Sequence, residues 1–187
     1  MIMQRRHVLL SGACLVIASF FAAPNRAFAN MQKHSYKQLV DALMQVDTHV
    51  TRLVAHRLDK RLSASNDFNL HLRSASLNTD DARLIATALR RIHKNQHLRL
   101  MSFSMSYNPD IGNLGIGEIL NALPNDITEL GLVGCELDDD ASPDIVMFIQ
   151  RSTTLQVVCL ENNKFSNDAK IFIRDSTKHL PECVTIL

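Results

Sequence analysis

The apolar residues in the second half of the chain repeat with a period of 28 residues. In ITELGLVGCEL (127–137), counted as slots 1 to 11, slots 1, 4, 6, 9 and 11 hold Ile127, Leu130, Leu132, Cys135 and Leu137. In LQVVCLENNKF (155–165), the same slots hold Leu155, Val158, Leu160, Asn163 and Phe165. Such internal periodicity is typical of repeat architectures.

Two earlier stretches follow the same spacing less strictly. The unit that starts at residue 100 has Leu100, Phe103, Met105 and Asn108, with Ile111 one place late because Pro109 lengthens the turn. The unit before it has Leu70, Leu72, Ala75 and Leu77, and Asp67 fits its first slot poorly. A partial fifth unit is expected to begin with Cys183 and to place Ile186 in slot 4.

Each slot has a physical reason. Slots 4 and 6 are two residues apart, so on a short strand both side chains point to one face, the core. The backbone turns sharply after the strand, and an Asn in slot 9 can bind its buried peptide groups. Cysteine tolerates burial and offers a weak S–H donor, so Cys135 is expected to be structural.

Helical patterns separate the predicted strands. They cover residues 79–91, 114–123, 142–151 and 167–176, with N-caps expected at Thr79 or Asp80, at Ser142, and at Asn167 or Asp168. Parallel strands require crossovers of this kind. The pattern therefore predicts an α/β solenoid in which stacked units bury one continuous core.

The L-x-x-L-x-L-x-x-N/C-x-L spacing and the helix in every unit resemble leucine-rich repeat proteins of the ribonuclease-inhibitor class. The stretch IGNLGIGEILNALPNDI (111–127) carries the resemblance best, through Gly115, Ile119, Leu123 and Asn125. The resemblance covers residues 68–187 and implies a short right-handed leucine-rich repeat solenoid. Residues 67–187 would then form about four units and a partial fifth.

Residues 30–66 are expected to form an N-terminal cap. Apolar residues at 39, 43, 46, 50, 53, 58 and 62 predict one helix over 35–62. A solenoid core must be covered at its end, which favours a capping helix. A two-stranded coiled coil is the alternative, because the steps also satisfy a heptad. Residues 63–67 are expected to form a loop.

Residues 1–29 have the pattern of a cleaved export signal. A basic start, an apolar run of about 16 residues and Ala-Phe-Ala before Asn30 match its three regions. Arg5-Arg6 resemble a twin-arginine signal. We expect a periplasmic or secreted protein without stable membrane insertion after cleavage. A retained anchor is the alternative, which the run disfavours because it is shorter than the ~20 residues that a spanning helix needs.

Charge is divided unevenly along the chain beyond the signal. Residues 33–99 contain 12 basic and 6 acidic residues, whereas residues 100–187 contain 5 and 13. Such asymmetry can steer association with a partner, although it also occurs on surfaces without one. Three cysteines remain after the predicted cleavage, an odd number that does not favour a complete disulfide framework.

No pattern indicates catalysis, a cofactor or a metal. His93 and His97, like His49 and His56, have no third ligand placed beside them, and the aspartates at 138–140 lack the spacing of a calcium loop. The basic run at 90–99 lacks the interleaved aromatic residues typical of single-strand nucleic-acid binding. We therefore expect a non-enzyme without cofactor, metal or nucleic-acid partner.

Slots 3, 5 and 7 point away from the core and would line the concave sheet. The candidate partner-binding residues on or beside these slots are His71, Arg73, Tyr107, Glu129, Val133, Val157, Cys159 and Glu161. We expect a non-catalytic module that binds a protein partner there, with Tyr107 as anchor; binding on the convex or lateral side stays open. The alternatives are a secreted effector acting on a host protein and a thiol-dependent or hydrolytic enzyme using Cys159. The oligomeric state is left open.

Overall fold

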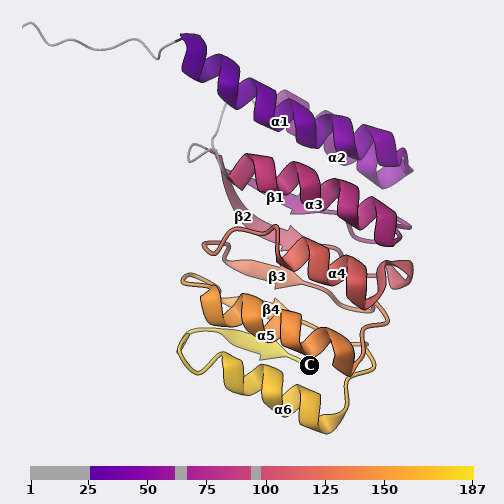
Figure 1. The fold of residues 1–187 in the computed structure, drawn as a ribbon, viewed down its shortest axis with the longest axis vertical. Coiled ribbons are helices and arrows are strands. Elements are labelled where there is room, and N and C mark those ends of the chain that lie inside the picture. The colour runs from indigo at the N-terminus through magenta and orange to yellow at the C-terminus, as the bar shows by residue number, and fades with distance from the viewer. Residues whose placement is uncertain (1–25, 62–66, 94–97) are drawn as a thin grey trace, which may run out of the picture.

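The computed structural model describes residues 26–61, 67–93 and 98–187, and in these ranges strands and helices alternate (Figure 1). The strands form one parallel sheet in the order β1-β2-β3-β4-β5. They are β1 (Asp67–His71), β2 (Arg99–Ser104), β3 (Glu129–Gly131), β4 (Val157–Cys159) and β5 (Val184–Ile186). The crossover helices are α3 (Thr79–His93), α4 (Gly112–Leu120), α5 (Ser142–Arg151) and α6 (Asn167–Ser176). Short 3₁₀ turns, η1 (Pro109–Ile111) and η2 (Asp139–Ala141), precede α4 and α5.

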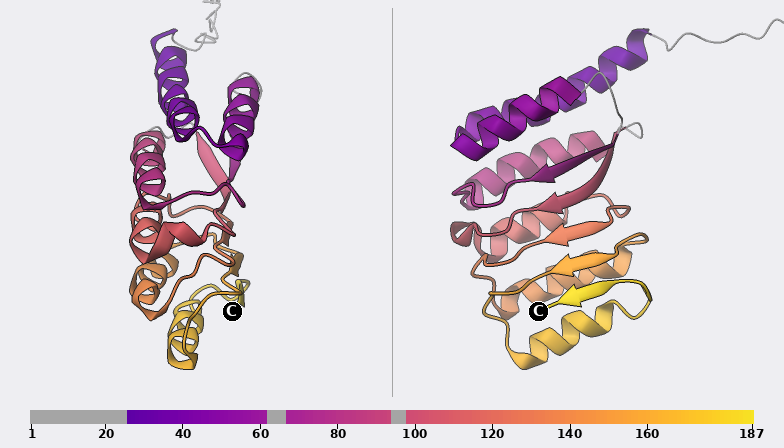
Figure 2. Two further views of the ribbon diagram at one scale, coloured as in Figure 1. Left: turned by 90° about the vertical axis from the view of Figure 1, so that its right-hand side faces the viewer. Right: turned by 180° about the vertical axis from the view of Figure 1, so that it is seen from behind.

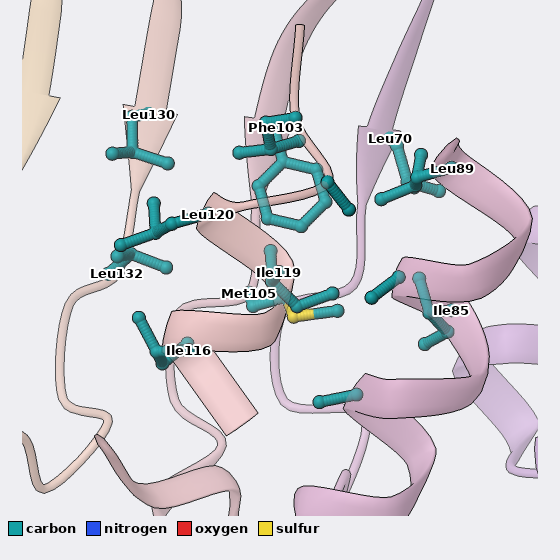
Figure 3. Packing of buried hydrophobic residues seen from close by; sticks show 14 of the residues in the cluster. Leu70, Ile85, Leu89, Phe103, Met105, Ile116, Ile119, Leu120, Leu130 and Leu132 are labelled. Carbon is teal, nitrogen blue, oxygen red and sulfur yellow. The ribbon is translucent and has the colours of Figure 1, made fainter. Parts of the chain in front are cut away.

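The register of the sheet follows the sequence repeat in the first four units. Phe103 lies opposite Leu70 on one side and Leu130 on the other, and Leu130 lies opposite Val158. These slot-4 residues are buried, and Figure 3 shows Leu70, Phe103 and Leu130 side by side on neighbouring strands. The predicted α/β architecture with stacked parallel strands is therefore confirmed.

One layer of helices covers one face of the sheet. The crossover helices α3 to α6 all lie on the same side of the strands (Figure 2), and their apolar residues pack against slots 4 and 6. Ile85 and Leu89 of α3 and Ile116 and Ile119 of α4 lie in this layer (Figure 3). The opposite face carries slots 3 and 5; of the described helices, only α2 borders it, beside Asn69 and His71 of β1.

A buried polar ladder runs through the turns that follow the strands. The Asn108 amide donates to the carbonyl oxygens of Leu72 (2.8 Å) and Met105 (2.7 Å) and accepts from the N–H groups of Ala75 (2.9 Å) and Leu77 (3.1 Å).

Two units further along the chain, Asn163 makes the equivalent bonds to Leu132, Leu160, Cys135 and Leu137. Between these asparagines, the buried Cys135 thiol donates to the Met105 carbonyl at 3.3 Å. The structural role expected for Cys135 is confirmed.

The register of the last unit corrects the sequence analysis. Thr185, not Ile186, lies opposite Val158, and Ile186 lies opposite Cys159 on the outward face. The offset from β4 to β5 is 27 residues rather than 28. No 3₁₀ turn like η2 precedes α6, which removes three residues, whereas the return from α6 to β5 is two residues longer than the return from α5 to β4. Val184 and Ile186 consequently stay 57% and 41% exposed.

The N-terminal segment is a helical hairpin rather than the single helix predicted over 35–62. Helix α1 (Arg26–Val46) ends where Asp47 adopts a left-handed φ of 59°, and α2 (His49–Arg61) follows. The Thr48 N–H donates to Thr51 Oγ1 (3.0 Å), and the Thr51 N–H donates to Thr48 Oγ1 (3.2 Å). This reciprocal capping starts a new helix and reverses the chain.

The hairpin lies at the β1 end of the solenoid-like array. Helix α1 packs on α3 and extends the helix layer, whereas α2 lies at the sheet side next to β1 (Figure 2). Leu39, Leu43 and Leu58 of the predicted apolar stripe are buried within the chain. The stripe is thus shared between the two helices and the array.

The predicted export signal lies mostly outside the described residues, since only its last four positions belong to α1. The loop predicted at 63–67 lies outside them too, except for Asp67 at the start of β1. Among the helices that are described, none has the length and apolar character needed to cross a membrane.

The observed helix caps precede the predicted ones by one to four residues. The Asn78 carboxamide accepts from the Asp80 and Asp81 N–H groups at the start of α3. Asp138 caps η2, which leads into α5, and Ser166 caps α6 by accepting from Ala169. The caps predicted at Thr79 or Asp80, Ser142, and Asn167 or Asp168 are therefore wrong, because a short turn or an earlier polar residue takes the role.

Candidate interaction face

The outward-facing slots form one continuous surface, here called the open sheet face (slots 3, 5 and 7 of each unit). One row consists of Asn69, Ser102, Glu129, Val157 and Val184, and the next of His71, Ser104, Gly131, Cys159 and Ile186. Backbone bonds beyond the strands keep slot 7 aligned, so Arg73, Ser106, Val133 and Glu161 form a third row. The sequence-predicted residues other than Tyr107 therefore share one face.

A hydrogen-bonded chain crosses the first three strands on this face. His71 Nε2 lies 2.8 Å from Ser102 Oγ, and Ser102 Oγ–H donates to Glu129 Oε2 at 2.7 Å. With the serine proton directed at the carboxylate, His71 serves as the donor to the serine oxygen. This arrangement orients three polar groups, but it leaves the imidazole unable to accept the serine proton as a base would.

Arg73 and Tyr107 lie at the carboxyl end of the strands and contact each other. The Arg73 guanidinium carbon lies 4.2 Å above the centre of the Tyr107 ring, a cation–π geometry. On another side, a β-carbon at Gly134 would lie 3.1 Å from the Tyr107 ring. Tyr107 is held at the turn and is 38% exposed, so it borders the open sheet face.

The turn position of Tyr107 requires a left-handed backbone in every complete unit. Slot 8 has positive φ at Ser74 (52°), Tyr107 (60°), Gly134 (61°) and Asn162 (57°). Glycine and asparagine adopt this region readily, whereas a tyrosine there is strained by roughly 1–3 kcal/mol. The left-handed backbone at Tyr107 sets the direction in which its side chain leaves the turn.

Negative charge gathers at the β3–β4 side of the face. Burial, followed by the charges of Glu161 and Glu129, raises the pKa of the Cys159 thiol above its ordinary value of 9.0. The thiol is therefore protonated at neutral pH and is a poor nucleophile. The Glu161 Oε2 atom is buried and has no hydrogen-bond partner among the described residues.

Two shallow hollows occupy this surface. One, of about 250 Å³, is lined by His71 and Arg73 of the first unit, by Ser104 and Gly131 on its floor, and by Cys159 at its far side. The second, of about 360 Å³, lies between α2 and β1 and is lined by Val54, Arg57, Leu58, Lys60, Asn69 and His71. Because both include His71, the hollows adjoin.

Several residues of this face carry no role in the sequence analysis. Ser102 links His71 to Glu129, and Arg57 arrives from α2, which the single-helix prediction did not fold back onto the sheet. Val184 and Ile186 add an exposed apolar edge, which the sequence analysis missed because it placed Ile186 in the core-facing slot 4. An alternation of apolar residues at 184 and 186 was the available signal for that strand face.

The other candidate groups have structural partners or lie elsewhere. Asp138 accepts from the Asn113 side chain (2.6 Å), and Asp139 accepts from the Ser166 N–H (2.8 Å). The residues that the structure describes contain no cluster of three or more His, Cys, Asp or Glu side chains suited to a metal ion. His97 lies outside the described residues, as does the His93 side chain.

The three cysteines in the described part of the chain are free thiols: Cys135 is buried, and Cys159 and Cys183 are partly exposed. Searches of protein-family models and of curated proteins find no match to this chain. The class of the protein is therefore defined by its architecture: a solenoid-like α/β protein with one uncovered sheet face.

Proposed function

We propose that this chain is a leucine-rich repeat protein of the ribonuclease-inhibitor class that acts as a non-catalytic interaction module. Three features support this assignment: the 28-residue period, the alternation of strand and helix, and the Asn/Cys ladder in the turns. Protein recognition follows from the observation that the open sheet face is uncovered and bears charged groups around a shallow hollow.

The chemistry of this face favours binding over catalysis. The one accessible thiol on it, Cys159, is held protonated by burial and by two neighbouring carboxylates. The serine beside His71 directs its proton to Glu129 rather than to the imidazole. We therefore propose that the protein has no enzymatic activity, and Cys159→Ser should leave partner binding and every function measured in cells unchanged.

Site-specific photocrosslinking tests the location of binding. A photoreactive amino acid replaces Asn69, an exposed residue of the open sheet face beside the hollow, or, as matched control, Met147, which is 55% exposed on α5 in the helix layer. We expect a defined crosslinked protein from position 69 and none from position 147. Crosslinks from position 147 alone would place the binding site on the helix side and refute the proposal.

The export signal leads us to propose a periplasmic or secreted location. A basic start, an apolar run and Ala-Phe-Ala before Asn30 carry this proposal. Cell fractionation distinguishes the two destinations: mature chain in the periplasm favours an envelope protein, and mature chain in the culture medium favours an effector that acts on a host protein. Uncleaved chain in the cytoplasm would refute export.

A further inference from the structure

The cations at the β1 end of the open sheet face are placed for a ligand carboxylate. Arg73 is oriented by the Tyr107 ring at 4.2 Å, and in the part of the chain that is described it forms no ion pair. Arg57 of α2 and His71 line the adjoining hollow. An arginine held by stacking loses little freedom on binding, and its guanidinium matches a carboxylate.

The β3–β4 side of the same face offers the opposite charge. Glu161 occupies the same row as Arg73, because successive backbone bonds align slot 7 across the units. Its Oε2 atom is buried and unpartnered within the described residues, and Glu129 lies on the neighbouring strand. Since burying an acceptor without a donor is unfavourable, a cationic group from a ligand would be stabilised here.

The spacing between these groups sets the length of the ligand. Arg73 and Glu161 belong to units one and four, and three strand spacings of about 4.8 Å give about 14 Å. An extended peptide advances about 3.4 Å per residue, so about four residues cover that distance. Side chains at positions i, i+2 and i+4 of an extended segment point to the same side.

We propose that the open sheet face binds an extended segment of a partner protein that carries an acidic and a basic residue four positions apart. The carboxylate pairs with Arg73 near His71, and the basic side chain pairs with Glu161 near Glu129. The side chain at i+2 enters the hollow of about 250 Å³ above Ser104 and Gly131. This proposal rests on the proposed function and names the partner chemistry for that face.

The floor of the hollow leads us to expect a central side chain that is apolar and modest in size. Gly131 has no side chain, and the hydroxyl groups of Ser104 and Ser106 bond to each other at 3.2 Å. The Ser106 oxygen also accepts from the Val133 N–H. Because these hydroxyls are engaged within the protein, the floor presents small groups with little demand for polar partners.

A random peptide library displayed on phage tests the proposal against the full chain after its native processing. The wild-type protein should enrich peptides with Asp or Glu and Lys or Arg four positions apart, in either order. Peptides selected with Arg73→Glu should carry a basic residue in place of the acidic one and should keep the other basic residue. Arg91→Glu, an identical charge change on the exposed side of α3, should leave the enriched pattern unchanged.

The controls separate this proposal from the function on which it rests. Ser104→Trp fills the hollow and should abolish enrichment. If circular dichroism shows that Ser104→Trp does not fold, Cys159→Trp fills the hollow in its place. For one selected peptide, Arg73→Ala should weaken binding about two- to five-fold, as exposed ion pairs do.

If Ser104→Trp abolishes enrichment but the peptides lack the charge spacing, the charge proposal is overturned and the proposed function stands. The same holds if Arg73→Glu leaves the enriched peptides unchanged. Enrichment insensitive to both tryptophan variants overturns the proposed function as well.

Discussion

Replacing Asn108 by alanine tests whether the buried turn ladder holds the units together. The Asn108 side chain is fully buried and makes two donated and two accepted bonds between 2.7 and 3.1 Å, besides a longer donated contact of 3.3 Å to the Ser106 carbonyl. The Leu72, Ala75 and Leu77 partners belong to the preceding unit, so this amide joins two units. Alanine removes all of these bonds and leaves buried peptide groups without partners.

The expected cost follows from the number of bonds. A typical buried hydrogen bond contributes about 0.5–1.5 kcal/mol net, and an orphaned buried group costs about 1–3 kcal/mol. Water entering the vacated volume would satisfy part of the loss. We expect Asn108→Ala to reduce the free energy of unfolding by about 3–5 kcal/mol, at the upper end of single substitutions.

Cys135→Ala provides the internal comparison. The Cys135 thiol donates to the Met105 carbonyl at 3.3 Å, but that oxygen also accepts from Asn108. Removing the thiol therefore leaves no carbonyl of the ladder wholly unpaired, and we expect a loss of only about 1 kcal/mol. Asn113→Ala, at a half-buried asparagine whose bond to Asp138 is solvent-exposed, serves as surface control at about 0.5 kcal/mol or less.

Urea unfolding monitored by circular dichroism measures all three variants. The midpoint should fall in the order Asn108, Cys135, Asn113, with the slope of the transition unchanged. Equal losses for Asn108→Ala and Cys135→Ala would show that the amide is replaced by water at no cost, and the ladder would not be the element that joins the units. A reduced slope would instead indicate that the array no longer unfolds as one unit.

Three further changes probe the turns and the open sheet face. Gly134→Ala should lower the free energy of unfolding by about 1–2 kcal/mol, because alanine is strained at φ 61° and its β-carbon meets the Tyr107 ring; an unchanged thermal midpoint would contradict this. Glu161→Gln should lower the raised pKa of Cys159 and speed its alkylation between pH 8 and 9; an equal rate would mean that burial alone sets that pKa. Hydrogen bonds from Ser166 lower the pKa of Asp139 from 3.8, so the charged carboxylate stabilises the fold, and this stability is lost as the pH falls through the lowered pKa. Asp139→Asn should therefore make the free energy of unfolding less sensitive to acid; identical acid titrations of the two proteins would contradict this.

The sequence predicts the sheet well where several units can be aligned. Three aligned units fix which residues face the core, and a one-residue error would turn every side chain to the opposite face. The last strand had only Cys183 and Ile186 to align, and the net loss of one residue between β4 and β5 moved Ile186 outward. Because of this one-residue shift, the sequence analysis did not predict the exposed apolar edge that Ile186 forms with Val184.

The helical hairpin shows a different limit of periodicity. The apolar positions continue at steps of three and four through Val46 and Val50, so the pattern shows no interruption. The chain nevertheless reverses at Asp47, because Thr48 and Thr51 cap each other. A local hydrogen-bond pattern thus overrides a continuous stripe, and the spacing of the two threonines was its only trace in the sequence.

The candidate site was predictable as a set of rows but not as a set of contacts. Slot numbering places His71, Ser102 and Glu129 on the outward face, because side chains alternate along a strand. It does not determine that Ser102 bonds to both neighbours, which depends on side-chain torsions. The Arg73–Tyr107 contact likewise depends on the left-handed backbone of the turn, and a tyrosine in the sequence does not predict that backbone conformation.

The strained position of Tyr107 links the repeat to the proposed binding. Two of the equivalent turns use Gly134 and Asn162, which adopt positive φ at little cost, and the third uses Ser74, so the turn itself does not need a tyrosine. The ring that occupies this costly position carries the Arg73 guanidinium at 4.2 Å. A strained residue that stabilises the turn less than asparagine would, yet orients a cation that has no ion pair among the described residues, supports the proposed recognition role. The core slots and the ladder supply the stability that offsets this strain, which leaves the outward slots free for binding.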